Sequence, residues 1–229
     1  MDFEFLLDAS GSITSEKWSE AVTSVADDWI INAIKPVYGE FGNHVAARWF
    51  SSNTERFIDF QESSFPTSGH TDYAEYVASI MRNAPYEGRH TYTGTALGAV
   101  YSSDLITSRQ LGKENTIVFV FTDGQSDDAH DTIHEATELR NHATVFSVAI
   151  GTNVDADELN AISSTGVYIQ IEDVTEIQSL MNSVLVGGGT MQQNAACKEY
   201  DCSNIFRNAD PMKMRTKGCS SRTGKSKFK

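Results

Sequence analysis

Short apolar runs alternate with segments of helical spacing along most of this 229-residue chain. The runs cover residues 3–7, 45–50, 54–60, 117–121, 144–150 and 167–171. Between them, apolar side chains recur every three to four residues, as at Trp18, Val22, Val25 and Trp29, which is the spacing of a helix face that packs on a sheet. This alternation predicts an α/β fold with a doubly wound, mostly parallel sheet and helices on both faces.

The expected order of elements follows from local signals. A tight turn at 51–53 makes the strand over 54–60 an antiparallel edge strand. Inward-facing Ala96, Leu97, Val100 and Tyr101 are expected on the helix that begins at Thr93. Further helices are expected after Thr14, over 71–83, over 132–139, over 155–163 and after Asp173.

Oxygen-bearing side chains follow the first apolar run, in the segment Asp8-Ala9-Ser10-Gly11-Ser12. Gly11 allows the backbone to turn sharply, so Asp8, Ser10 and Ser12 share one loop. In an open α/β sheet, ligands bind at the carboxyl ends of the strands, where this loop lies. One carboxylate and two hydroxyls suit Mg²⁺, Mn²⁺ or Ca²⁺ better than Zn²⁺ or copper. The alternative to a metal site is a purely structural role, in which these residues form a capping loop between a strand and a helix.

Two downstream segments complete a family pattern. Residues 8–12 resemble the D-x-S-x-S signature of the von Willebrand factor A (vWA) domain, the fold shared with integrin I domains. Residues 91–97 resemble its T-x-T-G-x-A-L segment, and residues 117–124 resemble its apolar strand followed by T-D-G. The resemblance extends over residues 1–187 and implies a Rossmann-like vWA fold.

The resemblance also implies a metal-ion-dependent adhesion site. It assigns the metal to Asp8, Ser10, Ser12, Thr91 and Asp123, with Mg²⁺ expected and Mn²⁺ or Ca²⁺ as alternatives. A protein ligand's acidic side chain would complete the coordination. The residues expected near that ligand are Gly11, Tyr92, Gly124 and Gln125, where Gln125 stands in place of the Glu of many integrin-type relatives.

The last forty residues differ in character from the rest. Residues 1–189 carry 9 Lys and Arg against 28 Asp and Glu, whereas residues 190–229 carry 9 against 3. Three glycines at 187–189 end the predicted domain, so residues 188–229 are expected to be a hinge and a basic tail with little regular structure. The tail holds Cys197, Cys202 and Cys219, which could form a disulfide and leave one thiol for self-association or another chain.

Composition and motifs exclude several classes of function. The acidic body argues against nucleic acid as a partner, and no apolar run is long enough for membrane insertion. No secretion signal precedes the first strand in this numbering. The segment 130–134 imitates a zinc-protease H-E-x-x-H helix, but Asp131 replaces the catalytic Glu.

We therefore expect a secreted or cell-surface binding module for adhesion or matrix assembly, and not an enzyme. An intracellular vWA scaffold subunit of a multiprotein complex is the alternative. A metal-dependent hydrolase ranks third, because no base or nucleophile accompanies the metal loop.

Overall fold

The computed structural model describes residues 1–38, 42–60, 72–106, 108 and 111–171. Residues 61–71, the helix expected after Asp173, the glycine hinge and the three cysteines lie outside the described residues. Among the described helices, none combines the length and the hydrophobicity that crossing a bilayer requires.

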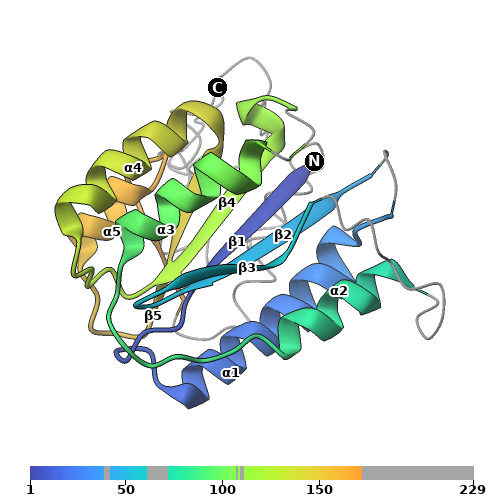
Figure 1. Cartoon of the computed structure of the whole chain (residues 1–229), viewed down its shortest axis with the longest axis horizontal. Helices are drawn as coiled ribbons and strands as arrows, with labels where there is room; N and C mark the ends of the chain where they lie inside the picture. The colour runs from blue at the N-terminus through green and yellow to red at the C-terminus, as the bar shows by residue number, and fades with distance from the viewer. Residues whose placement is uncertain (39–41, 61–71, 107, 109–110, 172–229) are drawn as a thin grey trace, which may run out of the picture.

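A twisted sheet forms the centre of the domain, with strand order β3-β2-β1-β4-β5-β6 (Figure 1). All neighbouring strands are parallel except β3, which pairs antiparallel with β2 at the edge, as the sequence predicted. The strands are β1 (Asp2–Asp8), β2 (His44–Phe50), β3 (Thr54–Ile58), β4 (Thr116–Thr122), β5 (Thr144–Ile150) and β6 (Ile169–Ile171).

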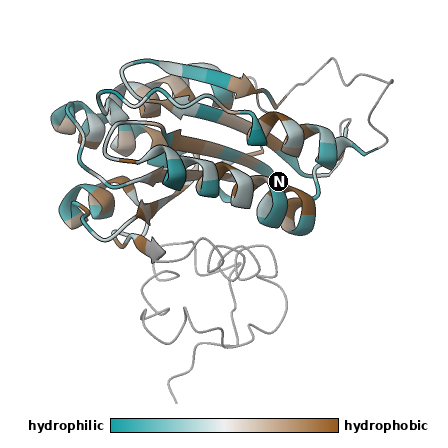
Figure 2. Cartoon of the chain, turned by 90° about the horizontal axis from the view of Figure 1, so that it is seen from below, coloured by the Kyte–Doolittle hydropathy of each residue, from teal (hydrophilic) through white to brown (hydrophobic). Residues whose placement is uncertain are grey.

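Helices cover both faces of this sheet. The elements are α1 (Ser15–Ser24), η1 (Val25–Ile34), α2 (Tyr73–Arg82), α3 (Thr93–Ala99), η2 (Val100–Leu105), η3 (Lys113–Asn115), α4 (Ala129–His142) and α5 (Ala156–Ile162). Helices α1 and α2 lie on one side of the sheet, and α3, α4 and α5 lie on the other (Figure 1). The first side buries Phe5 and Phe119 around Trp29, and the second buries Leu6 and Val120. In Figure 2 the central strands are mostly brown, and the helices around them carry many teal residues.

Two helices differ from the expectation in detail. The helix that begins after Thr14 passes into the π-helical segment η1 and ends at Ile34, where Lys35 takes a left-handed conformation. The helix from Thr93 likewise passes into the π-helical η2. The prediction that Tyr101 faces inward is wrong, since it is exposed and its ring stacks on His142, 4.6 Å away. The altered periodicity of a π-helix moves a residue off the face that α-helical spacing assigns to it.

Helices α3 and α4 approach each other closely at Gly94. A β-carbon on Gly94 would lie 2.5 Å from the backbone nitrogen of Thr132, whereas one on Gly98 would meet only the flexible end of the Glu135 side chain, at 3.0 Å. We predict that Gly94→Ala lowers the free energy of unfolding by about 3 kcal/mol, because backbone on α4 cannot yield to the added methyl group.

Gly98→Ala is the matched control for this prediction. It adds the same methyl group one turn away, and its effect should lie between neutral and a gain of about 1 kcal/mol from helix propensity. Urea denaturation of the two variants would test this, and equal stabilities would contradict the close-packing argument.

Candidate metal centre

Asp8 is the centre of the predicted site. It ends β1 and is fully buried. Its Oδ1 accepts a hydrogen bond from the backbone N–H of Ser10 at 2.8 Å, and its Oδ2 accepts one from the hydroxyl of Thr122 at 2.7 Å. Thr122 is the last residue of β4, so this bond joins the carboxyl ends of two neighbouring strands.

The two serines of the first loop lie together. The hydroxyl oxygens of Ser10 and Ser12 are 3.0 Å apart, with Ser10 buried and Ser12 exposed. Gly11 between them donates its N–H to the carbonyl of Arg89 at 2.8 Å. A β-carbon on Gly11 would lie 3.1 Å from the Gly88 carbonyl oxygen, so a glycine allows the first loop to contact the segment that carries Thr91.

Thr91 is buried in the loop before α3. Its N–H donates to Oδ2 of Asp127 at 3.0 Å, and its carbonyl accepts the N–H of Asp127 at 2.8 Å. The next residue, Tyr92, is half-buried, and its ring stacks on His90 at 5.7 Å. The Thr91 loop is therefore fixed to the loop that follows β4.

Asp123 lies in that loop, directly after β4, and is buried. Its Oδ1 accepts the N–H of Gln125 at 3.2 Å, and its carbonyl accepts the N–H of Asp155 at 2.9 Å. Gly124 has φ +76°, and a β-carbon there would lie 2.8 Å from the Asp155 carbonyl oxygen. Gln125 is exposed, and its amide donates to the Asn153 carbonyl at 2.8 Å.

Sequence reasoning missed several residues that hold these loops. Ser51, buried at the end of β2, donates its hydroxyl to the His90 carbonyl at 2.8 Å and accepts the N–H of Arg89 at 3.1 Å. The carboxylate of Asp128 accepts the N–H groups of Gly94 and Thr95, both at 3.0 Å, at the start of α3. These bonds join residues more than thirty positions apart, so no local pattern indicates them. The acidic pair after the T-D-G segment was the only signal for Asp128.

The electrostatics of the site fit a bound divalent cation. Burial raises the pKa of Asp8 to about 7, against hydrogen bonds from Ser10 and Thr122 that lower it, and the nearby Asp123 raises it further. A cation beside both carboxylates would offset this cost. The donors are oxygens of carboxylates and hydroxyls only, which is the chemistry that Mg²⁺ and Mn²⁺ prefer.

Glu158 is a second buried acid near these loops. It lies on α5, and burial raises its pKa to about 8, with further increases from Asp155, Asp128 and Asp123. Its Oε1 has no hydrogen-bond partner. The neighbouring carboxylate of Asp155 accepts the N–H groups of Asp157 and Glu158, so the acids at 155–158 begin a helix as the sequence suggested.

We predict a pH-dependent stability from Glu158. Its folded-state pKa lies above the ordinary 4.5, so between about pH 4.5 and 8 the folded domain retains a proton that the unfolded chain loses. The free energy of unfolding should therefore fall as pH rises through this window. Glu158→Gln should reduce that fall by on the order of 3 kcal/mol, at about 1.4 kcal/mol per pKa unit.

Urea denaturation at pH 5, 7 and 9 in EDTA measures this pH dependence of the free energy of unfolding. Asp157→Asn, which changes an exposed acid on the same helix, is the control. Parallel pH profiles for Glu158→Gln and wild type would contradict the assignment.

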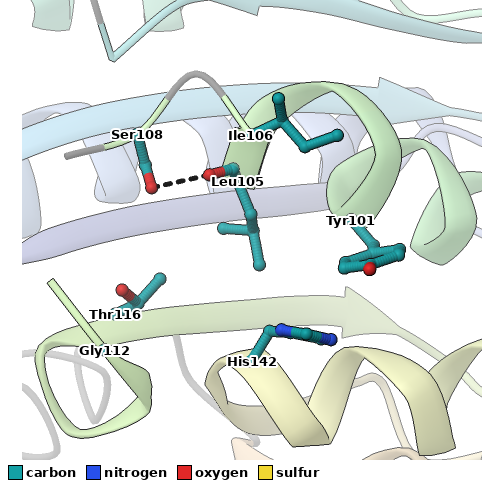
Figure 3. Close-up of a pocket in the computed structure, with 7 residues that line it drawn as sticks. All are labelled: Tyr101, Leu105, Ile106, Ser108, Gly112, Thr116 and His142. Carbon is teal, nitrogen blue, oxygen red and sulfur yellow. Dashed lines mark hydrogen bonds between the residues drawn. The ribbon is translucent and has the colours of Figure 1, made fainter. Parts of the chain in front are cut away.

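Two of the hollows in the described part of the chain lie at opposite ends of the sheet. One of about 480 Å³ lies beside the metal loop and is lined by Gln125, Val154, Asp155, Ala156 and Asp157. The other, of about 290 Å³, lies near the start of β4, at the opposite end of the sheet from Asp8 (Figure 3). Its lining is mostly apolar and comprises Tyr101, Leu105, Ile106, Ser108, Gly112, Thr116 and His142.

Comparison with known proteins places the chain in a family. The sequence profile of the von Willebrand factor type A domain matches residues 2–183. The chain belongs to the vWA family. Curated relatives are the collagen alpha-1(XXI) chain of Xenopus laevis, 27% identical over 192 residues, and the human collagen alpha-1(XX) chain, 26% identical over 213 residues. These alignments cover 80% and 87% of this vWA chain but only 18% and 15% of the collagens.

Solved structures show the same fold. Proximal thread matrix protein 1 of the mussel byssus, solved with zinc in its metal-ion-dependent adhesion site (MIDAS) motif, superposes with a TM-score of 0.61 at 22% identity. The match covers 80% of this chain and 46% of that one. The manganese-loaded TRAP protein of Plasmodium vivax superposes with a TM-score of 0.60 at 18% identity, covering 81% and 73%. The expected Rossmann-like vWA fold is therefore confirmed.

Proposed function

We propose that this vWA domain binds one divalent cation through Asp8, Ser10, Ser12, Thr91 and Asp123, and through it an acidic side chain of another extracellular matrix protein. The observation that carries the proposal is the buried Asp8 carboxylate, which lies near Asp123 and beside the hydroxyls of Ser10 and Thr122. The collagen relatives support a place in the extracellular matrix.

Some of these residues would bind the ion, and others fix the loops that carry the ligands. The hydroxyls of Ser10 and Ser12 would bind the ion directly. The carboxylates of Asp8 and Asp123 and the hydroxyl of Thr91 would bind it directly or through water. Thr122, Ser51 and Asp127 keep the three loops in register. With only two anionic ligands, a divalent cation retains the electrophilicity to accept one more carboxylate. Mg²⁺ and Mn²⁺ are the ions we expect, and the zinc and manganese in the two structural neighbours support a divalent ion at such a site.

Exposed and half-buried side chains around the site would contact the bound partner. Tyr92 and His90 form an aromatic stack beside Thr91, and Gln125 lies two residues after Asp123 with its amide bonded to the Asn153 carbonyl. Ligand specificity is therefore expected to depend on Tyr92 and Gln125.

Surface plasmon resonance against a panel of purified matrix proteins, including fibrillar collagens, tests this function. Binding is expected in Mg²⁺ or Mn²⁺ and should disappear in EDTA. Conversion of the immobilised protein's carboxyl groups to methylamides should also remove it, because the proposed contact is a carboxylate. A signal that survives either EDTA or amidation would overturn the proposal.

A further inference from the structure

The outward face of α4 carries an unusual stripe. Ile133, His134 and Thr137 lie three, four and seven positions after His130, so the four residues share one side of the helix. The side chain of His130 is 96% exposed and that of His134 is 65% exposed. Ile133 between them is half exposed. The protease-like segment 130–134 is thus a pair of accessible imidazoles one helical turn apart.

Each of the two imidazoles is oriented by a neighbouring carboxylate. Nδ1 of His130 lies 3.3 Å from Oδ1 of Asp131, and Nδ1 of His134 lies 3.3 Å from Oε1 of Glu135. An ionised carboxylate only accepts hydrogen bonds, so Nδ1 is the donor in both rings. In the neutral imidazole this leaves the lone pair on Nε2, on an exposed side chain.

We propose that His130 and His134 form a second metal site, which binds a divalent ion of the zinc, copper and nickel class through their two Nε2 atoms. Histidines at i and i+4 on one helix have β-carbons about 5–6 Å apart, and this spacing lets two rings meet one ion. A hydrogen bond from the other ring nitrogen to a carboxylate is the usual support of a metal-bound histidine.

The ligand set determines which ion this site takes. Imidazole suits zinc, copper and nickel, whereas Mg²⁺ and Ca²⁺ require oxygen ligands. Among the described residues, no group of three or more His, Cys, Asp or Glu side chains is placed to hold an ion. The pair therefore supplies two ligands, and water or a donor group on another molecule supplies the others. This site differs in chemistry from the oxygen site at Asp8 and does not depend on the proposed adhesion function.

Titration calorimetry with Ni²⁺ on the full chain tests the proposal. All proteins carry Asp8→Asn to remove the oxygen site, and their thiols are reduced and alkylated so that cysteines do not bind nickel. Saturable binding of one ion is expected, and either His130→Gln or His134→Gln should weaken it at least about tenfold, which is the minimum cost of losing an outer partner of a metal ligand. His142→Gln is the matched control, since His142 is on the same helix but stacks on Tyr101 (Figure 3). Equal Ni²⁺ binding by all four proteins would overturn the proposal.

Electron paramagnetic resonance with Cu²⁺ provides a second readout that loss of folding does not imitate. The Asp8→Asn protein should show coupling of the copper to two imidazole nitrogens, and His130→Gln should show one. Asp131→Asn and Glu135→Gln leave both rings in place, so each should retain both nitrogens while weakening Ni²⁺ binding about tenfold. A copper spectrum without nitrogen coupling in the Asp8→Asn protein would also refute the site.

Discussion

Replacing Asp8 with asparagine is expected to abolish Mg²⁺ binding while leaving the domain folded. The carboxylate is the buried negative charge at the centre of the loop, and the amide keeps its shape but removes that charge. Loss of an outer hydrogen-bond partner of a metal ligand costs about 10–100-fold in affinity, and loss of a charged ligand should exceed about 100-fold. Calorimetric titration of EDTA-treated protein with Mg²⁺ and Mn²⁺ measures the effect.

The raised pKa of Asp8 allows loss of metal binding in this variant to be distinguished from loss of folding. Because burial raises that pKa to about 7, the metal-free domain is destabilised by the ionised carboxylate at neutral pH and above. Asp8→Asn removes this cost, so it should unfold at no lower urea concentration than metal-free wild type at pH 8. Asp157→Asn, an exposed acid in the first turn of α5, is the control and should bind Mg²⁺ normally. Undiminished binding by Asp8→Asn would exclude Asp8 as a ligand.

Removing Asp104 should produce the largest loss of stability. This fully buried carboxylate on η2 receives two hydrogen bonds from Arg48 on β2, at 2.8 and 2.9 Å, and one from Arg56 on β3 at 3.1 Å. Arg48 is itself buried, so Asp104→Ala leaves a guanidinium charge without its partner inside the protein. Breaking such a pair costs about 3–5 kcal/mol, which urea denaturation at pH 7 would detect.

Glu4 adds a specific consequence to this prediction. It is fully buried on β1 with neither carboxyl oxygen hydrogen-bonded. Burial raises its pKa well above the ordinary value, Asp104 raises it further, and Arg48 lowers it. Without Asp104, Glu4 should ionise more readily and partly compensate Arg48, so adding Glu4→Gln to Asp104→Ala should destabilise the domain further.

Asp59→Ala is the comparison for both variants. Its ion pair with Arg56, at 3.2 Å, is partly exposed, so its loss should cost less than about 1 kcal/mol. If Asp104→Ala were no more harmful than Asp59→Ala, the buried network would not be a source of stability.

Much of the fold was predictable from local patterns. The apolar run at 117–121 indicated β4, and the period of Val77 and its neighbours indicated α2, because burial on a sheet imposes a spacing along the chain. The turn at 51–53 also predicted the antiparallel edge strand. Helix boundaries were less predictable, since π-helical segments follow both α1 and α3 without a signal in the sequence.

The sequence by itself determined which side chains carry the proposed chemistry: Asp8, Ser10 and Ser12 after one strand, Thr91 before a helix, and Asp123 after another strand. Only the tertiary structure decided how they are held. Thr122 bonds to Asp8 across 114 positions, and Ser51 contacts the Thr91 loop across 38. A periodic pattern of apolar residues indicates only which residues share a face of the same helix or strand. The hydrogen-bond partner of a buried polar group depends instead on which distant loop the fold places beside it, because most polar groups removed from water are stabilised by a hydrogen bond.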